Sequence, residues 1–188
     1  MEDHSFEQPG AGTECSQPCL RTDQELTAFY ERNVKLVYIL CYLYLKSAAD
    51  AEDAVQTVFI KLLQTDILFQ SREHERAWLI TTAKNHCRDL LKSWWRRRRV
   101  DWDSLPEAAS QEDDPQIKEL LAGLLALPEK YRIVLHLHYL EGYSVREIAA
   151  LLERNESTIR SQLLRGREKL KTDLGGRDFG QKSCGQNI

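Results

Sequence analysis

Residues 141–170, with the sequence EGYSVREIAALLERNESTIRSQLLRGREKL, restrict the possible fold more than any other stretch of the chain. Ser144 and Glu147 have the spacing of a capping box, in which each side chain covers a backbone amide at the start of a helix. Apolar residues follow at helical spacing as far as a polar corner at residues 153–155. Within this corner, Asn155 is a residue type that caps a helix or accepts a left-handed backbone angle. We therefore predict two helices joined by a short corner.

The second of these helices has an apolar face and a polar, cationic face. The apolar face contains, at spacings of four, three and four, Ile159, Leu163, Gly166 and Leu170. The outer face contains Ser157, Thr158, Arg160, Ser161, Leu164 and Arg165. This arrangement is typical of a helix-turn-helix, whose second helix enters the major groove of DNA. The alternative is a helical hairpin whose arginines only interact with water. We favour DNA binding because capping, corner length and charge placement agree.

Three more amphipathic helices precede this segment. The first begins at Asp23, the second follows a cap at Ser47, and the third runs from about Glu75 to Arg97. The predicted inward residues are Leu26, Phe29, Tyr30, Val37, Leu40, Cys41 and Tyr44 in the first helix, Ala54, Val55, Val58, Phe59, Leu62 and Leu63 in the second, and Ile80, Ala83, Cys87, Leu90, Leu91 and Trp94 in the third. Three such helices with short connections predict a small bundle.

An acidic stretch over residues 100–116 interrupts the periodicity and predicts a flexible linker. Helical spacing resumes at residue 117. Pro128 suits the first turn of the next helix, and Gly142 suits the left-handed residue that closes that helix. No segment alternates convincingly like a strand. We therefore expect an all-α protein with two small helical domains, over residues 23–99 and 117–174.

The two ends of the sequence have a different character. Residues 1–22 have no periodicity and predict a disordered leader, and residues 175–188 predict a flexible tail. The start lacks the pattern of a secretory signal, and no apolar run has the length of a membrane span. Because the sequence also lacks a disulfide framework, we expect a cytoplasmic protein. The roles of Cys15, Cys19 and the tail stay open.

The net charge of −3 hides a strong segregation of charge along the chain. Residues 70–99 contain nine basic and three acidic residues, a net charge of +6, and residues 101–119 contain one basic and seven acidic residues, a net charge of −6. A local asymmetry of this size indicates separate interaction surfaces more directly than the total does.

The third helix combines cations with aromatic residues. We expect one side of it to carry Lys84, Asn85, Arg88, Asp89 and Lys92, near Trp78, Trp94, Trp95 and Trp102. Cations and flat rings are the ingredients of single-strand capture, and the preceding loop at residues 70–74 is a candidate wall for a base pocket. An equally good interpretation is a tryptophan core beside a hydrated basic face.

The second helix has an acidic and polar surface formed by Asp50, Glu52, Asp53, Gln56 and Thr57. Such a surface suits a basic protein partner. Acidic residues near a helix N-terminus are also favoured by the helix dipole alone, so both explanations stay open. The histidines do not form a ligand set with suitable carboxylates, and no glycine-rich phosphate loop is present. We therefore expect no catalytic residues, no metal and no cofactor.

Taken together, these features resemble the extracytoplasmic function (ECF) sigma factors of bacterial RNA polymerase. DAEDAVQTVFIKLLQ is similar to the family's core-polymerase-binding helix, and RAWLITTAKNHCRDLLKSWWRRRR is similar to its −10 promoter-reading helix. Residues 127–171 are similar to its −35-reading domain. The resemblance covers roughly residues 25–174, in the expected order. It therefore implies a sigma factor that directs promoter-specific initiation and is not an enzyme.

The resemblance also implies a role for each surface. The core polymerase, through its β′ clamp and β subunits, would be bound by Asp50, Glu52, Asp53 and Gln56. The melted −10 strand would be held by Gln70, Ser71, Arg72, Glu73, His74, Trp78, Asn85, Arg88, Asp89 and Lys92. The −35 duplex would be read by Ser157, Thr158, Arg160, Ser161, Leu164 and Arg165. The acidic linker would pass through polymerase channels, and an anti-sigma factor is a candidate further partner.

Three features depart from the family pattern. The leader is longer than usual, Glu153-Arg154 stands where many relatives have a glycine, and Gln162 stands where an arginine is common. The corner backbone and one phosphate contact are therefore expected to differ from the family. The alternative function is a stand-alone helix-turn-helix regulator that does not join polymerase. A degenerate sigma-like protein that sequesters a partner without reading a promoter is a third possibility.

Overall fold

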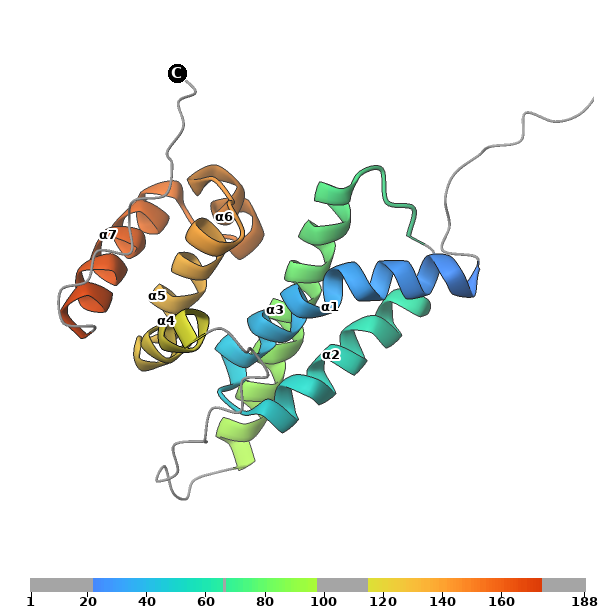
Figure 1. The fold of residues 1–188 in the computed structure, drawn as a ribbon, viewed down its shortest axis with the longest axis horizontal. Helices are drawn as coiled ribbons and strands as arrows, with labels where there is room; N and C mark the ends of the chain where they lie inside the picture. The colour runs from blue at the N-terminus through green and yellow to red at the C-terminus, as the bar shows by residue number, and fades with distance from the viewer. Residues whose placement is uncertain (1–21, 66, 98–114, 174–188) are drawn as a thin grey trace, which may run out of the picture.

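The structure, a computed structural model, describes residues 22–65, 67–97 and 115–173. Its helices, in chain order, are α1 (Asp23–Leu45), α2 (Ala48–Leu63), α3 (Arg72–Arg97), α4 (Pro115–Ala126), α5 (Glu129–Leu135), the π-helical turn η1 (His136–Leu140), α6 (Val145–Leu152) and α7 (Glu156–Asp173). No strand occurs in the described part of the chain. The prediction of an all-α protein built from two small groups of helices is confirmed there (Figure 1).

The first group contains α1, α2 and α3, which pack on one another. Thr22 and Glu25 form a capping box at the start of α1, and the Ser47 side chain accepts from the amide of Asp50 at the start of α2. Most predicted inward residues are buried, among them Phe29 at the centre of the bundle. Leu63 and Tyr30 were also predicted to lie inward, but they are 61% and 44% exposed.

The second group contains α4 to α7, in which α7 packs on α5 and α6. The capping box of Ser144 and Glu147 is present, and Gly142 has the predicted positive φ of 75°. The left-handed residue of the corner is Glu153, with a φ of 55°, and not Asn155. Asn155 instead lies directly before α7, where its carbonyl accepts from the amides of Thr158 and Ile159. A single non-glycine residue in this conformation costs about 1–2 kcal/mol.

Helices α5 and α7 pack closely at Gly166. A Cβ at this position would lie 3.1 Å from Leu135 Cδ1 and 3.2 Å from Tyr131 Cβ. The absence of a side chain therefore lets α7 approach α5, which fixes the orientation of the α7 outer face.

The two groups of helices lie against each other (Figure 1). α1 packs on α5, α3 packs on α6, and the buried apolar residues of both groups form one continuous cluster. Patterns of helical spacing gave no sign of this contact. Several predictions concern residues that the structure does not describe. They are those on most of the leader and linker, the whole tail, Cys15, Cys19, Trp102 and the Trp95 side chain. Residues 115 and 116 of the predicted linker belong to α4.

Candidate nucleic-acid interface

The outer face of α7 is free to meet a ligand. All six residues predicted to read duplex DNA on this helix are exposed. Arg160 pairs with Glu156 at 2.7 Å, and Ser161 Oγ donates to the carbonyl of Ser157 at 2.9 Å. Leu164 is 62% exposed, which is unusual for a leucine and suits contact with a thymine methyl group. Three hydroxyls, two guanidinium groups and an apolar side chain therefore share one accessible face.

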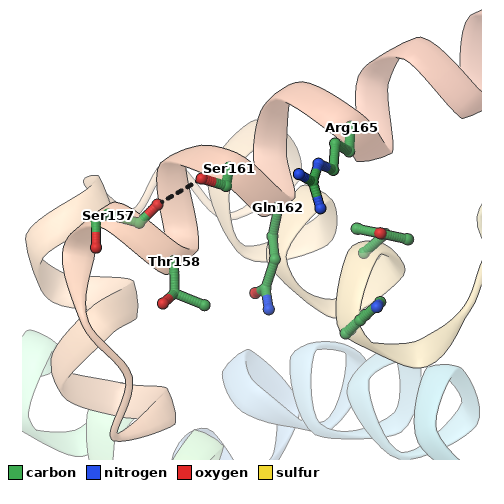
Figure 2. A pocket seen from close by; sticks show the side chains of 7 residues that line it. Ser157, Thr158, Ser161, Gln162 and Arg165 are labelled. Carbon is green, nitrogen blue, oxygen red and sulfur yellow. Dashed lines mark hydrogen bonds between the residues drawn. The ribbon is translucent and has the colours of Figure 1, made fainter.

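A shallow pocket of about 290 Å³ lies between this face and the start of α5. It is lined by Lys130, Tyr131, Ser157, Thr158, Ser161, Gln162 and Arg165. Figure 2 shows Gln162 and Arg165 extending from α7 toward α5. The ammonium group of Lys130 lies 5.0 Å from the centroid of the Tyr131 ring. Two cations from different helices, Lys130 and Arg165, thus border one polar hollow. This is suitable chemistry for a phosphate group.

Lys130 was not predicted as a functional residue. Its segment has the apolar spacing of a core helix, and Tyr131, Ile133 and Val134 beside it are buried. A single lysine at the start of such a helix carries no signal in the sequence. Gln162 has a structural role here, since its Oε1 accepts from Arg154 Nη1 at 3.1 Å and so ties α7 to the corner.

On α3, part of the face predicted to hold single-stranded DNA is exposed. The exposed residues are Asn85, Arg88, Asp89 and Lys92. The Lys92 Nζ atom lies 3.4 Å from Asp89 Oδ1. Trp78 is half-buried and packs edge-on against Phe69, with ring centroids 6.0 Å apart. These residues therefore form an accessible polar face with an aromatic side chain at one end.

The segment before α3 is shorter than predicted. α3 begins at Arg72, so Arg72, Glu73 and His74 form its first turn. Of the predicted loop at residues 70–74, only Gln70 and Ser71 precede the helix. Ser71 Oγ accepts from the His74 amide at 3.2 Å and acts as a cap, which the sequence analysis missed. Two hydrogen bonds lower the pKa of the Glu73 carboxyl group. The larger effect comes from the backbone of Glu73 itself, and the next from the Ser71 side chain.

Lys84 does not lie on the exposed cationic side of α3, where it was predicted. Its residue surface is 1% exposed, and its ammonium group donates to the carbonyl of Leu151 and to Glu153 Oε1, both at 2.9 Å. Leu151 lies in the last turn of α6, and Glu153 follows directly after that helix. The prediction was wrong because helical spacing cannot show that another group of helices covers this side of α3.

The acidic surface lies on the N-terminal half of α2. Glu52, Asp53 and Gln56 are exposed and Asp50 is half-buried, so these residues form one accessible patch near the start of the helix. Among the described residues, no cluster of histidine, cysteine and carboxylate side chains has the arrangement of a metal site. None of the helices described is both long and apolar enough to cross a membrane.

Comparison with known proteins gives two family matches. Residues 29–99 match the family described as Sigma-70 region 2, and residues 117–170 match Sigma-70, region 4. The RNA polymerase sigma factor CarQ of Myxococcus xanthus is 31% identical over 138 residues, which cover 69% of this chain and 78% of that protein. The ECF RNA polymerase sigma factor SigX of Bacillus subtilis is 24% identical over 169 residues, which cover 81% of this chain and 84% of that protein.

Two solved structures have a similar fold. The first is the sigma factor RpoE in complex with the anti-sigma factor NepR from Bartonella quintana. It matches with a TM-score of 0.68 and 20% identity, over 81% of this chain and 98% of that chain. The second is CnrH in complex with the cytosolic domain of CnrY. It matches with a TM-score of 0.54 and 22% identity, over 85% of this chain and 93% of that chain.

Proposed function

Because the chain belongs to the ECF sigma factors of bacterial RNA polymerase, we propose that its three exposed surfaces divide the work of promoter recognition. In this proposal the acidic patch on α2 binds core polymerase, the polar face of α3 holds melted −10 DNA, and the outer face of α7 reads −35 duplex. The observation that carries the proposal is that these surfaces, on separate helices, are accessible in one folded chain.

The −35 contact is supported by the chemistry of α7. Ser157, Arg160 and Ser161 lie in its first two turns, where a recognition helix meets base edges. Arg165 lies further along and borders the same hollow as Lys130. We therefore assign Lys130 to a phosphate of the −35 duplex beside Arg165. Phosphate contacts fix the register of a protein on DNA, and base contacts supply its specificity.

The −10 contact is supported by the exposed polar side chains of α3. Asn85 and Arg88 offer donors to bases and phosphates, and half-buried Trp78 offers an aromatic surface against which an unpaired base can stack. Binding of unpaired bases would favour melting through mass action, because it stabilises the open state of the DNA and not the duplex. This step needs no nucleotide hydrolysis by the protein.

The core contact is supported by the charge of α2. Glu52 and Asp53 are exposed on adjacent positions, and Gln56 lies one turn further on the same side. We assign this patch to the β′ clamp. An anti-sigma factor is a further proposed partner, since two proteins of similar fold were solved in complexes with NepR and with CnrY. We expect this function to take place in the cytoplasm.

The alternative of a stand-alone regulator is tested by association with core polymerase. The full chain is mixed with purified core enzyme and passed through a size-exclusion column at low salt. A sigma factor comigrates with the core enzyme. A regulator that reads duplex DNA alone elutes separately while still binding a −35 duplex, and that result would favour the alternative.

A further inference from the structure

An ion pair beneath the surface joins α1 to the first turn of α3. Arg32 of α1 donates through Nε to Glu75 Oε1 and through Nη2 to Glu75 Oε2, both at 2.9 Å. Asn33 Nδ2 also donates to Glu75 Oε1 and, at 2.9 Å, to the carbonyl of Phe29. The Glu75 side chain is 7% exposed, and the Arg32 side chain is 35% exposed. Three side chains of two helices therefore meet at the point where α3 begins.

Beside this ion pair, a row of aromatic rings leads from the core to the surface of α3. The Arg32 Cζ atom lies 4.9 Å from the centroid of the Phe29 ring, which is fully buried. The Phe29 ring stacks on Phe69 with centroids 5.7 Å apart, and Phe69 meets Trp78 edge-on at 6.0 Å. Phe69 belongs to the segment before α3, directly before Gln70. The ion pair and the rings therefore hold this segment and Trp78 to the same part of α1.

The backbone before α3 is also tied to the first turn of that helix. The amide of Glu75 donates to the carbonyl of Ser71 at 3.0 Å, and the amide of Gln70 donates to His74 Nδ1 at 3.4 Å. Gln70 and Ser71 are the two residues of the proposed −10 surface that precede the helix. Their positions consequently depend on where Glu75 is held.

Trp78 lies on the same side of α3 as the polar residues that we assign to −10 DNA. Asn85 follows it by about two turns of the helix and Lys92 by about four turns. The half-buried ring thus stands at one end of a polar row. One base of a single strand can stack there while the next phosphates follow the cations.

The Arg32–Glu75 pair suits orientation better than stability. Removal of two charges from water opposes their attraction, and apolar side chains in place of a buried pair often give an equal or greater stability. A planar guanidinium that meets a carboxylate through two parallel hydrogen bonds nevertheless fixes the direction of both partners. The benefit of this pair to the protein is therefore geometric.

We propose that Arg32 and Glu75 are positioning residues for the capture of an unpaired base. Neither residue needs to touch the DNA. Their ion pair sets the first turn of α3 on α1, and through Phe69 it places Gln70 and Trp78 around the captured base. The inference rests on the −10 contact of the proposed function and names the residues that shape it.

The test measures binding of the full chain to two kinds of single-stranded DNA by fluorescence anisotropy. One is a pool of strands of about 12 nucleotides with random bases, and the other is a strand of the same length in which every residue is abasic. Because cations bind the phosphates of both, the ratio of the two affinities measures the contribution of the bases. One stacked base should give the unmodified chain a ratio of about fivefold or more.

Two variants break the bidentate pair and keep the approximate size of the side chain, namely Glu75→Gln and Arg32→Lys. Both should reduce the ratio to less than about twofold and leave the affinity for the abasic strand unchanged. A change that only lowers the folded fraction weakens both affinities by the same factor, so the ratio separates positioning from folding. Glu31→Gln is the matched control, because it makes the same change on an exposed side chain of α1. It should keep the ratio of the unmodified chain.

Binding to a −35 duplex is the second measurement, since it depends on the other group of helices and both variants should retain it. The positioning role is wrong if the unmodified chain prefers strands with bases and both variants keep the same ratio. It is also wrong if the variants lose this preference and duplex binding together, because the pair then supports the fold as a whole. An unmodified chain with equal affinity for the two kinds of strand would contradict the proposed −10 contact itself, and the inference with it.

Discussion

Gly166 of α7 lies so close to Leu135 of α5 that a Cβ on the glycine would stand 3.1 Å from Leu135 Cδ1. This approach sets the orientation of the helix proposed to read DNA. We expect Gly166→Val to lower the free energy of unfolding by about 2 kcal/mol, because its methyl groups overfill the contact. Gly166→Ala should be nearer to neutral, since a gain of about 1 kcal/mol in helix propensity offsets a milder clash. Denaturant unfolding checks both, with Glu168→Ala as an exposed helical control; an unchanged stability of Gly166→Val would contradict the packing.

Loss of either cation beside the α7 hollow should weaken −35 duplex binding. For Arg165→Ala and for Lys130→Ala, we expect the slope of log affinity against log salt to fall by about one unit, because each removes one phosphate contact. Lys61→Ala, an exposed cation on α2, should leave the slope unaltered. If the Lys130 variant keeps the full slope, the assignment of this residue to a phosphate is wrong. Fluorescence anisotropy over a salt series provides the measurement.

Reversal of charge in the acidic patch should separate the two binding activities. Asp53→Arg should impair association with core polymerase, because the variant places a cation against a basic partner surface. Binding to an isolated −35 duplex should stay intact. Glu31→Arg makes the same change on an exposed part of α1 and should keep core binding. Equal effects of the two variants would argue against the clamp assignment.

Burial of His136 should make the stability dependent on pH. Burial lowers the pKa of His136 from 6.5 to about 4, so the unfolded chain takes up a proton first as the pH falls. Stability is therefore lost progressively between pH 6.5 and about 4, and this group should contribute a loss of about 1 kcal/mol by roughly pH 5.5. His136→Leu should remove that part of the loss. Exposed His74→Gln should retain it, and an identical pH profile for His136→Leu and the unmodified chain would contradict the assignment.

Local features of the fold could be predicted because their causes are local. The capping box at Ser144 needs only residues three apart, and the positive φ of Gly142 follows from the residue type and its place after a helix. The accessible outer face of α7 followed from helical periodicity. Residue preference made Asn155 a candidate for either a cap or a left-handed angle, whereas Glu153 adopts the angle and forms an ion pair with Lys84 of the other group of helices.

Features that depend on distant contacts could not be predicted. Lys84 reads as a surface cation because its acceptors lie on a segment that is remote in sequence. The hollow beside Arg165 depends on where α5 places Lys130, and no spacing in the sequence relates the two. The proposed site residues remain predictions, since the contacts with DNA and with polymerase belong to complexes of the protein.

Run-off transcription with purified core polymerase tests the central claim most directly. The template library varies the −10 and −35 sequences, and core enzyme alone serves as the background. We expect this chain to produce discrete transcripts that depend on both elements, and Arg165→Ala to reduce them at a fixed salt concentration. A chain that binds core polymerase and yet yields no transcript above background from any template would contradict its action as a sigma factor.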